Sequence, residues 1–362
     1  MDIKKIAITF GVMVIIVGCT SMPVSVMPTE DTNIQAVTST PPGLYKFTIA
    51  TGIVNSDWHE EGNGFSVEIN SQIPVISSSV KETKSLMENV DLLTSGKTGI
   101  AFVYDYHVIL ANQGGLMSAF PDAPIEKIVI KCGTEMSRPM FPNYAEAARI
   151  VLPLYEEQLY IVVSDASGIT SVTELKGKHV STGEPGSATE QQARFVTNSL
   201  GIDWNIDILH EQFDLTTAIE SLKNGQIDAF FLSIRTPNVK LAELLKSDMP
   251  FKLIPIDGDN SKKILQANPA IFHPSKIPVG IYSTMQEDVS TLATTVVLAA
   301  MEDFPEEHTA QILEIFFNKS STSWKNRFAV TPESSIALLN AEAHIYLHQG
   351  TLDYFNEQGV LK

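Results

Sequence analysis

The chain has 362 residues, which at roughly 150 residues per domain predicts two domains, and its 44% apolar and 19% charged residues exclude a wholly disordered protein. A net charge of −17 without a cluster of cations argues against nucleic-acid binding. Two cysteines exclude a disulfide scaffold and a four-cysteine zinc site.

The N-terminus has the pattern of an export signal. Lys4 and Lys5 precede an apolar run over 6–17, which is too short for a hydrocarbon core of roughly 30 Å and therefore predicts a signal peptide over 1–18. The run ends in Gly18-Cys19, which resembles a bacterial lipobox in which Cys19 carries the lipid. The alternative is an ordinary signal peptide that happens to contain a cysteine.

The residue after Cys19 bears on localisation. It is Thr20 and not an aspartate. By analogy with lipoprotein sorting, we expect a lipid-anchored protein on the periplasmic face of a bacterial membrane, with the outer membrane favoured in a Gram-negative source. Residues 19–43 are rich in Ser, Thr and Pro and predict a flexible tether.

Segments with strand character follow from residue 44 onward and are separated by amphipathic stretches of helical length. These segments are 45–50, 98–104, 158–163, 178–182, 228–232 and 251–256. Strands that alternate with helices predict parallel sheets with crossover connections. The sequence therefore predicts an α/β chain with two lobes, each built on a parallel-dominated sheet.

The segment 183–190 combines a turn with the start of a helix. Ser187 and Glu190 have the spacing of a capping box, and Gly201 is placed to end the helix. Free N–H groups at a helix N-terminus bind anions, and Gly186 would let the backbone approach one closely. The alternative is a capped helix without a ligand. No Gly-Lys-Ser/Thr follows, so ATP binding is not indicated.

The order and spacing of several blocks resemble the TAXI family of TRAP-transporter solute receptors. The blocks are 154–163, 167–178, 183–190, 225–231, 253–258 and 277–282, followed by His348-Gln349-Gly350, Tyr354 and Gly359. The resemblance implies a periplasmic-binding-protein type II fold with two lobes and a hinge. It also implies delivery of a small carboxylate-bearing solute, an acidic amino acid or a dicarboxylate, to a TRAP-type membrane permease, with no cofactor.

The resemblance covers about 150–362 and weakens before it. The family has a glycine-rich loop that ends in tyrosines after the first strand, whereas this chain has the sequence 51–62, and Tyr104 stands near the place of a usual glutamine. We expect lobe 1 over 44–155, lobe 2 over 156–255, and a return to lobe 1 with C-terminal helices over 256–362.

Ligands of such proteins bind between the lobes, at the carboxyl ends of strands. Arg235 could hold a carboxylate through two hydrogen bonds, or it could be a solvated surface arginine. Trp58 could stack on a ligand or pack on its own lobe. The predicted ligand-binding residues are Thr51, Asn55, Ser56, Trp58, Tyr104, Gly186, Ser187, Thr189, Arg235 and Thr236.

Other candidate catalytic or metal-binding side chains give weaker patterns. His59-Glu60-Glu61 are consecutive and do not face one point, and His344 and His348 lack a third ligand, so no metal site is predicted. No Ser-His-Asp constellation is recognisable, and we expect no enzyme. Two alternatives remain: a sensor lipoprotein that signals to a membrane kinase, or an enzyme on the same two-lobed scaffold.

Overall fold

The computed structural model describes residues 43–54, 56–113, 147–246, 251–319, 328, 331–339 and 341–361. The predicted signal peptide over 1–18, the lipidation site Cys19, nearly all of the tether over 19–43, and Asn55 lie outside the described residues. Residues 43–362 form one compact unit. Among the described residues, no helix has the length and apolar character needed to cross a membrane.

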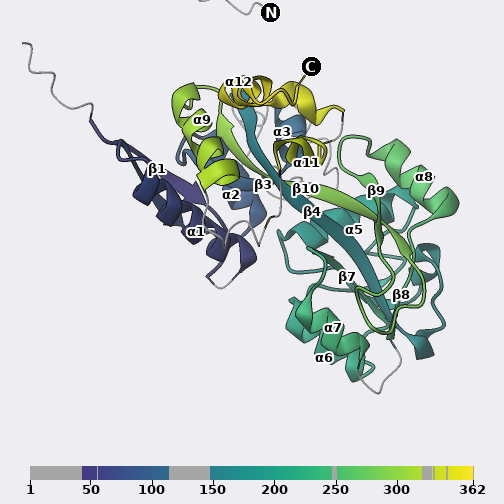
Figure 1. The fold of residues 1–362 in the computed structure, drawn as a ribbon. Helices are drawn as coiled ribbons and strands as arrows, with labels where there is room; N and C mark the ends of the chain where they lie inside the picture. The colour runs from purple at the N-terminus through teal and green to yellow at the C-terminus, as the bar shows by residue number, and fades with distance from the viewer. Residues whose placement is uncertain are drawn as a thin grey trace, which may run out of the picture. The chain divides into compact units, whose positions relative to one another are not determined.

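A first group of parallel strands lies at one side of the sheet (Figure 1). The strand β1 (Tyr45–Ala50) pairs with β2 (Ile76–Lys81) on one side and with β3 (Ile100–Tyr104) on the other, both in parallel. The helices α1 (Asp57–Gln72) and α2 (Leu86–Thr94) make the two crossover connections. We call these strands and helices the first lobe.

A second parallel group forms the other side of the sheet. The strand β5 (His179–Ser181) pairs in parallel with β6 (Leu209–Glu211) and with β7 (Ala229–Ile234). The connections between them contain α5 (Ala188–Ser199) and α6 (Leu215–Lys223). We call these strands and helices, with α7 (Val239–Leu245), the second lobe.

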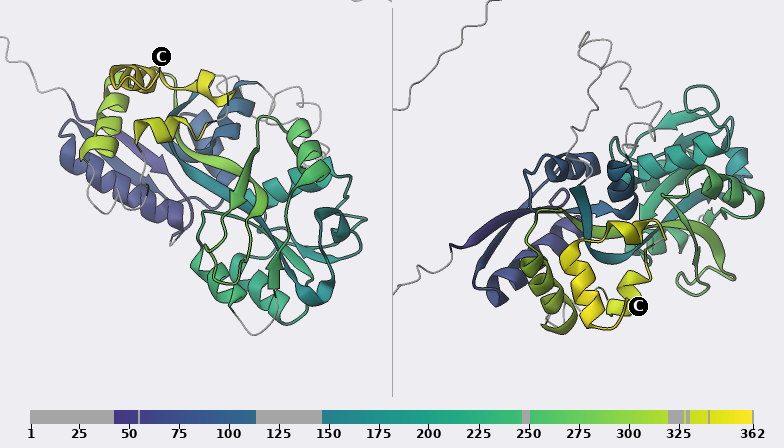
Figure 2. Two further views of the ribbon diagram at one scale, coloured as in Figure 1. Left: turned by 45° about the vertical axis from the view of Figure 1, so that its right-hand side comes forward. Right: turned by 90° about the horizontal axis from the view of Figure 1, so that it is seen from above.

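Two long strands join the lobes. The strands β4 (Ala148–Ser164) and β10 (Val289–Met301) are antiparallel to each other; β10 also pairs with β3, and β4 with β7. The views in Figure 2 place the two lobes on opposite sides of this β4–β10 pair. The sheet order is β2-β1-β3-β10-β4-β7-β5-β6, with β8 (Phe251–Leu253) beside β4 and β9 (His273–Ile277) beside β10.

This arrangement confirms the predicted two-lobed α/β fold. The parallel sheets of the two lobes are the two arms of a single hydrogen-bonded sheet, because the antiparallel β4 and β10 lie between them. The lobe boundaries over 44–155, 156–255 and 256–362 stay a prediction.

The remaining elements are helices and short turns. The 3-10 turns Asp165–Ser167 and Val172–Leu175 lie between β4 and β5. The helices after β8 are α8 (Gly258–Ala267), α9 (Glu306–Glu314), the π-helix Ile315–Lys319, α11 (Pro332–Ile336), the 3-10 turn Ala343–Tyr346 and α12 (Gln349–Glu357). The helix α3 (Asp105–Asn112) directly follows β3. His344 lies in the 3-10 turn, whereas His348 is buried as the N-cap of α12, so the two histidines do not share one helix.

The side-chain alternation of β4 and β7 separates two hydrophobic cores. Ile161 and Phe231 belong to the large core that continues into the first lobe, whereas Val162 and Phe230 pack on the opposite face with α6 and α7. The same alternation decides which polar side chains near the middle of the sheet can meet.

Candidate functional site

The loop before α5 is held by hydrogen bonds to Ser187 and to the carboxylate of Glu190. Ser187 is the N-cap, and its hydroxyl accepts the N–H of Glu190 at 3.2 Å, as the capping-box spacing predicts. The Glu190 carboxylate in turn accepts the N–H of Gly186 at 2.6 Å. The sequence predicts that this N–H group could bind an anion. In the structure it already donates its hydrogen bond to the side chain of Glu190.

Two glycines of this loop meet close neighbours. Gly183 has a φ of 94°, and a Cβ there would lie 2.7 Å from that of Thr189. A Cβ on Gly186 would lie 3.3 Å from that of Ser85, the N-cap of α2. The loop of the second lobe therefore approaches the first lobe at Gly186.

The hydroxyl of Thr189 has a partner within the protein. It accepts the backbone N–H of Ser233, near the end of β7, at 3.0 Å. This bond ties the start of α5 to the neighbouring strand, while the hydroxyl hydrogen stays available for donation.

Arg235 follows β7 and reaches across to the first lobe. Its Nη1 lies 3.1 Å from Oε1 of Glu61 on α1, and its side chain is 28% exposed. The guanidinium carbon lies 4.5 Å from the centre of the Tyr155 ring, within the range of a cation–π contact. Arg235 is thus not a solvated surface arginine, because its guanidinium forms an ion pair with Glu61.

Glu61 is fully buried. Its Oε2 accepts the hydroxyl of Tyr155 at 2.8 Å. Burial raises the pKa of Glu61 to about 7, although Arg235 and the Tyr155 hydrogen bond lower it. Glu61 Oε1 and Arg235 Nη1 form an ion pair with each other at 3.1 Å, although neither atom has a hydrogen bond to a described residue.

A second buried carboxyl, Glu157, lies on the same face of β4 as Tyr155. Its Oε2 accepts the hydroxyl of Tyr104 at 2.5 Å and that of Ser233 at 3.5 Å. Burial raises the pKa of Glu157 to about 7, whereas the Tyr104 bond, Arg235 and a hydrogen bond from Trp58 lower it. β3, β4, β7 and α1 all contribute to the surroundings of this carboxyl.

Trp58 provides an aromatic wall beside Glu157. Its ring centre lies 5.5 Å from that of Tyr104 and 5.9 Å from that of Phe102, and the side chain is partly exposed. We call the assembly the interlobe cluster. Its members are Trp58, Glu61, Tyr104, Tyr155, Glu157, Ser233 and Arg235.

The structure places the predicted residues in three groups. Trp58, Tyr104 and Arg235 belong to the interlobe cluster, and Thr189 contacts it through Ser233. Thr51 is buried beneath α1 with its hydroxyl near His59, and Ser56 is the N-cap of α1. Gly186 and Ser187 shape the loop before α5 and are not recorded in contact with the cluster, and Thr236 faces the other side of β4.

Sequence reasoning missed the two glutamates at the centre of the cluster. The sequence analysis treats Glu61 only as a weak metal ligand, and Glu157 only as a member of the resembling block 154–163, just before the predicted strand 158–163. The alternation of side chains along β4 could have indicated Glu157, because it places Tyr155 and Glu157 on one face of the strand. Among the described residues, no three His, Cys, Asp or Glu side chains are grouped so that they could hold a metal ion.

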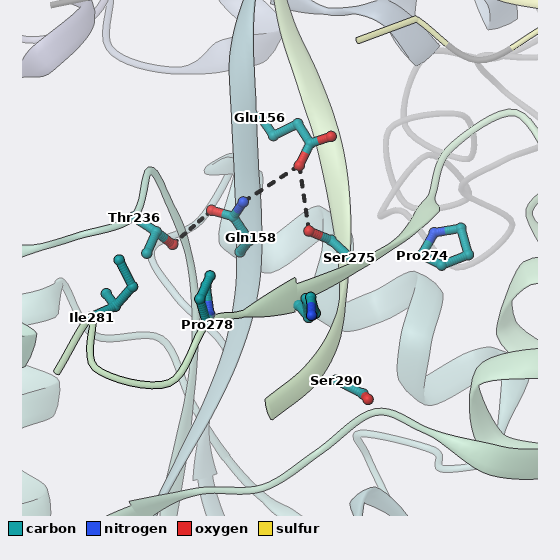
Figure 3. A pocket seen from close by; sticks show the side chains of 9 residues that line it. Glu156, Gln158, Thr236, Pro274, Ser275, Pro278, Ile281 and Ser290 are labelled. Atoms are coloured by element: carbon teal, nitrogen blue, oxygen red, sulfur yellow. Dashed lines mark hydrogen bonds between the residues drawn. The ribbon is translucent and has the colours of Figure 1, made fainter. Parts of the chain in front are cut away.

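A hollow of about 610 Å³ lies on the opposite face of β4 (Figure 3). Thr236 donates to Gln158 at 2.7 Å, and Ser275 donates to Glu156 at 3.3 Å. Hydrogen bonding from His273, at 3.0 Å, lowers the pKa of Glu156. The described residues that line the hollow are Glu156, Gln158, Thr236, Pro274, Ser275, Lys276, Pro278, Ile281 and Ser290.

Comparison with known proteins gives one family match. The model of the NMT1-like family matches residues 140–359, more than half of the chain. This range contains Tyr155, Glu157, Ser233 and Arg235, and it leaves out Trp58, Glu61 and Tyr104.

Several solved structures resemble the chain distantly. PhnD1 of Prochlorococcus marinus, in complex with methylphosphonate, is 12% identical with a TM-score of 0.47, and the match covers 88% of this chain and 100% of that one. The periplasmic aliphatic sulphonate binding protein SsuA of Escherichia coli is 17% identical with a TM-score of 0.41, over 86% and 83%. The GluR0 ligand-binding core of Nostoc punctiforme, in complex with L-glutamate, is 14% identical with a TM-score of 0.42, over 78% and 98%.

Proposed function

The chain belongs to the NMT1-like family, and on this premise we propose that it is an extracytoplasmic solute-binding receptor. It binds a small carboxylate-bearing solute, an acidic amino acid or a dicarboxylate, between its two lobes and releases it unchanged. The observation that carries the proposal is the interlobe cluster, in which residues of both lobes and of β4 surround Arg235 and two buried carboxyls.

Arg235 is the group proposed to bind the solute carboxylate. It is an arginine at the carboxyl end of a strand, and its guanidinium is stacked on Tyr155. Glu61 lies against the same guanidinium, so the solute carboxylate would share Arg235 with Glu61 or displace it. A guanidinium can serve two carboxylates, because it has five N–H donors in a fixed plane.

The membrane partner and the anchor are also part of the proposal. The residue blocks that resemble the TAXI receptors support delivery to a TRAP-type permease, and the Gly18-Cys19 pattern supports a lipid anchor. In this proposal the two lobes close on the solute by bending at β4 and β10, and the permease recognises the closed form.

A ligand screen tests the binding function. Acidic amino acids, 2-oxo acids and dicarboxylates are added to the full chain, and the melting temperature is measured. A solute present at 100 times its dissociation constant should add about 2.7 kcal/mol to the free energy of unfolding. Mass analysis after prolonged incubation should return the solute unchanged. If no compound of these three classes raises the melting temperature, the proposed solute class is wrong.

A further inference from the structure

The hollow on the opposite face of β4 has no part in the proposed receptor function. Its volume of about 610 Å³ lies in the range of sites that bind small molecules. Glu156 and Gln158 contribute to it from β4, Thr236 from the segment after β7, and Ser275 from β9. Its polar groups indicate which kind of ligand it could bind (Figure 3).

Glu156 supplies a negative charge to the hollow. Its Oε1 lies 3.0 Å from Nε2 of His273, and its Oε2 accepts the hydroxyl of Ser275 at 3.3 Å. The bond from His273 lowers the pKa of Glu156, and the bond from Ser275 adds to this effect, although burial opposes it. The side chain of Glu156 is 29% exposed, so a ligand that enters from solvent can reach an ionised carboxylate.

A chain of hydrogen bonds directs donors toward this carboxylate. A carboxylate only accepts, so Gln158 presents its Nε2 to Glu156, at 3.5 Å, and its Oε1 accepts the hydroxyl of Thr236 at 2.7 Å. Because the hydroxyl hydrogen of Thr236 is used in this bond, the hydroxyl of Tyr160 donates to Thr236. The hydroxyl hydrogens of Thr236 and Ser275 are therefore both engaged, whereas their oxygens keep lone pairs for a ligand.

The cations near the hollow leave the charge of Glu156 available. Among the described residues that line the hollow, Lys276 is the one lysine or arginine, and its Nζ lies 2.5 Å from Oδ2 of Asp288. His273 is charged only when it is protonated. The hollow thus offers an anion and hydroxyl acceptors, and a ligand that complements it carries a positive charge and donates hydrogen bonds.

The walls of the hollow are suited to a short carbon chain. Pro274, Pro278 and Ile281 contribute apolar surface, and the side chain of Ile281 is exposed. The net charge of −17 would also attract a cation during its approach.

We propose that the hollow is a second ligand site, which binds a small organic cation with a primary ammonium group on a short aliphatic chain. The carboxylate of Glu156 is the counter-ion, and the hydroxyl oxygens of Ser275 and Thr236 accept further N–H groups of the ammonium. The carbon chain lies against Pro278 and Ile281. This site is independent of the proposed carboxylate site, because it lies on the opposite face of β4.

Two probes with the same carbon chain test the proposal on the full chain. Putrescine and 1,4-butanediol differ in their charged amino groups, and calorimetric titration at pH 8, where histidine is ordinarily neutral, measures both affinities. A hydrogen bond to a charged group corresponds to about ten- to hundredfold in affinity, so we expect putrescine to bind at least about ten times more tightly than the diol. Glu156→Gln should weaken putrescine binding by about the same factor.

Glu302→Gln is the matched control. Glu302 pairs with Arg149 near the other end of β4, so its replacement removes the same charge at a distance from the hollow. It should leave the affinity for putrescine unchanged. Equal weakening by Glu156→Gln and Glu302→Gln would show that putrescine is only a counter-ion of an acidic chain, and the proposal would be overturned.

A second pair of variants does not alter Glu156. Ile281→Lys places a positive charge at the exposed edge of the hollow and should abolish putrescine binding, whereas Ile281→Gln should retain it. Equal affinity of these two variants, or no putrescine binding by the unaltered chain, would overturn the site. Neither result bears on the carboxylate screen, which tests the receptor function separately.

Discussion

At the scale of single residues, the structure gives the Thr189 hydroxyl a partner within the protein, and its role in ligand binding stays a prediction. The sequence predicts that this hydroxyl binds a ligand, and in the structure its oxygen accepts the N–H of Ser233 at 3.0 Å. Thr189→Ala would leave a partly buried backbone N–H at the end of β7 without this acceptor. We expect the free energy of unfolding to fall by about 1–3 kcal/mol in the absence of any solute.

Urea denaturation measures this change, with Thr173→Ala as the control. Thr173 is exposed and bonds only the hydroxyl of Ser171 among the described residues, so its replacement should change stability by less than about 0.5 kcal/mol. Equal stability of Thr189→Ala and the unaltered chain would mean that the bond to Ser233 contributes little.

Residues at strand ends were accessible to sequence reasoning, whereas buried carboxyls were not. Trp58, Tyr104 and Arg235 follow or end recognisable strands, where ligands of α/β proteins bind. Glu61 lies within a helix and Glu157 within a strand, and charged residues at such positions are usually solvent-exposed. Nothing in the pattern shows that they are buried until α1 and β4 are positioned in three dimensions.

At the scale of elements, α3 begins with a buried acid. Asp105 is 1% exposed, and its Oδ1 accepts the N–H of Tyr106 at 2.8 Å, while Oδ2 has no hydrogen bond to a described residue. Burial raises the pKa of Asp105 to about 7, although His273 and backbone hydrogen bonds lower it. Because the folded protein holds the proton more tightly than the unfolded chain, this group lowers stability as the pH rises from about 4 to about 7.

Asp105→Asn should remove that dependence. The stability of the variant relative to the unaltered chain should increase between pH 4 and pH 7, by up to about 4 kcal/mol, because each pKa unit corresponds to about 1.4 kcal/mol. Urea denaturation at pH 4 and pH 8 measures the difference. Asp207→Asn is the control, since hydrogen bonds lower the pKa of this partly exposed carboxyl and its replacement should change the pH dependence of stability in the opposite direction. If the free energy of unfolding depends on pH in the same way in Asp105→Asn and in the unaltered chain, the prediction is contradicted.

Strands were predictable from alternation or from a short apolar run of strand length. The alternation over 45–50 and the apolar segments near 100 and 230 correspond to β1, β3 and β7. β10 was missed, because Val289–Met301 is buried on both faces over most of its length and shows no alternation. A run of Ala, Thr and Val of this length has no period that separates a buried strand from a buried helix.

At the scale of the whole molecule, the anchor remains a prediction from the sequence. If Cys19 carries the lipid, Cys19→Ser should yield a protein that no longer partitions with membranes. Cys132→Ser is the matched control and should partition as the unaltered chain does. Sedimentation of membranes followed by immunodetection measures both. Membrane association of Cys19→Ser equal to that of the unaltered chain would contradict the lipoprotein assignment.

The central position of β10 has a consequence for how the chain can fold. This strand pairs with β3 on one side and with β4 on the other, yet it begins at Val289, 125 residues after β4 ends at Ser164. A chain that emerges from a ribosome or a translocation pore from its N-terminus cannot join its two lobes until Met301 has emerged. Until then, the facing edges of β3 and β4 lack their partner strand and are open to incorrect pairing.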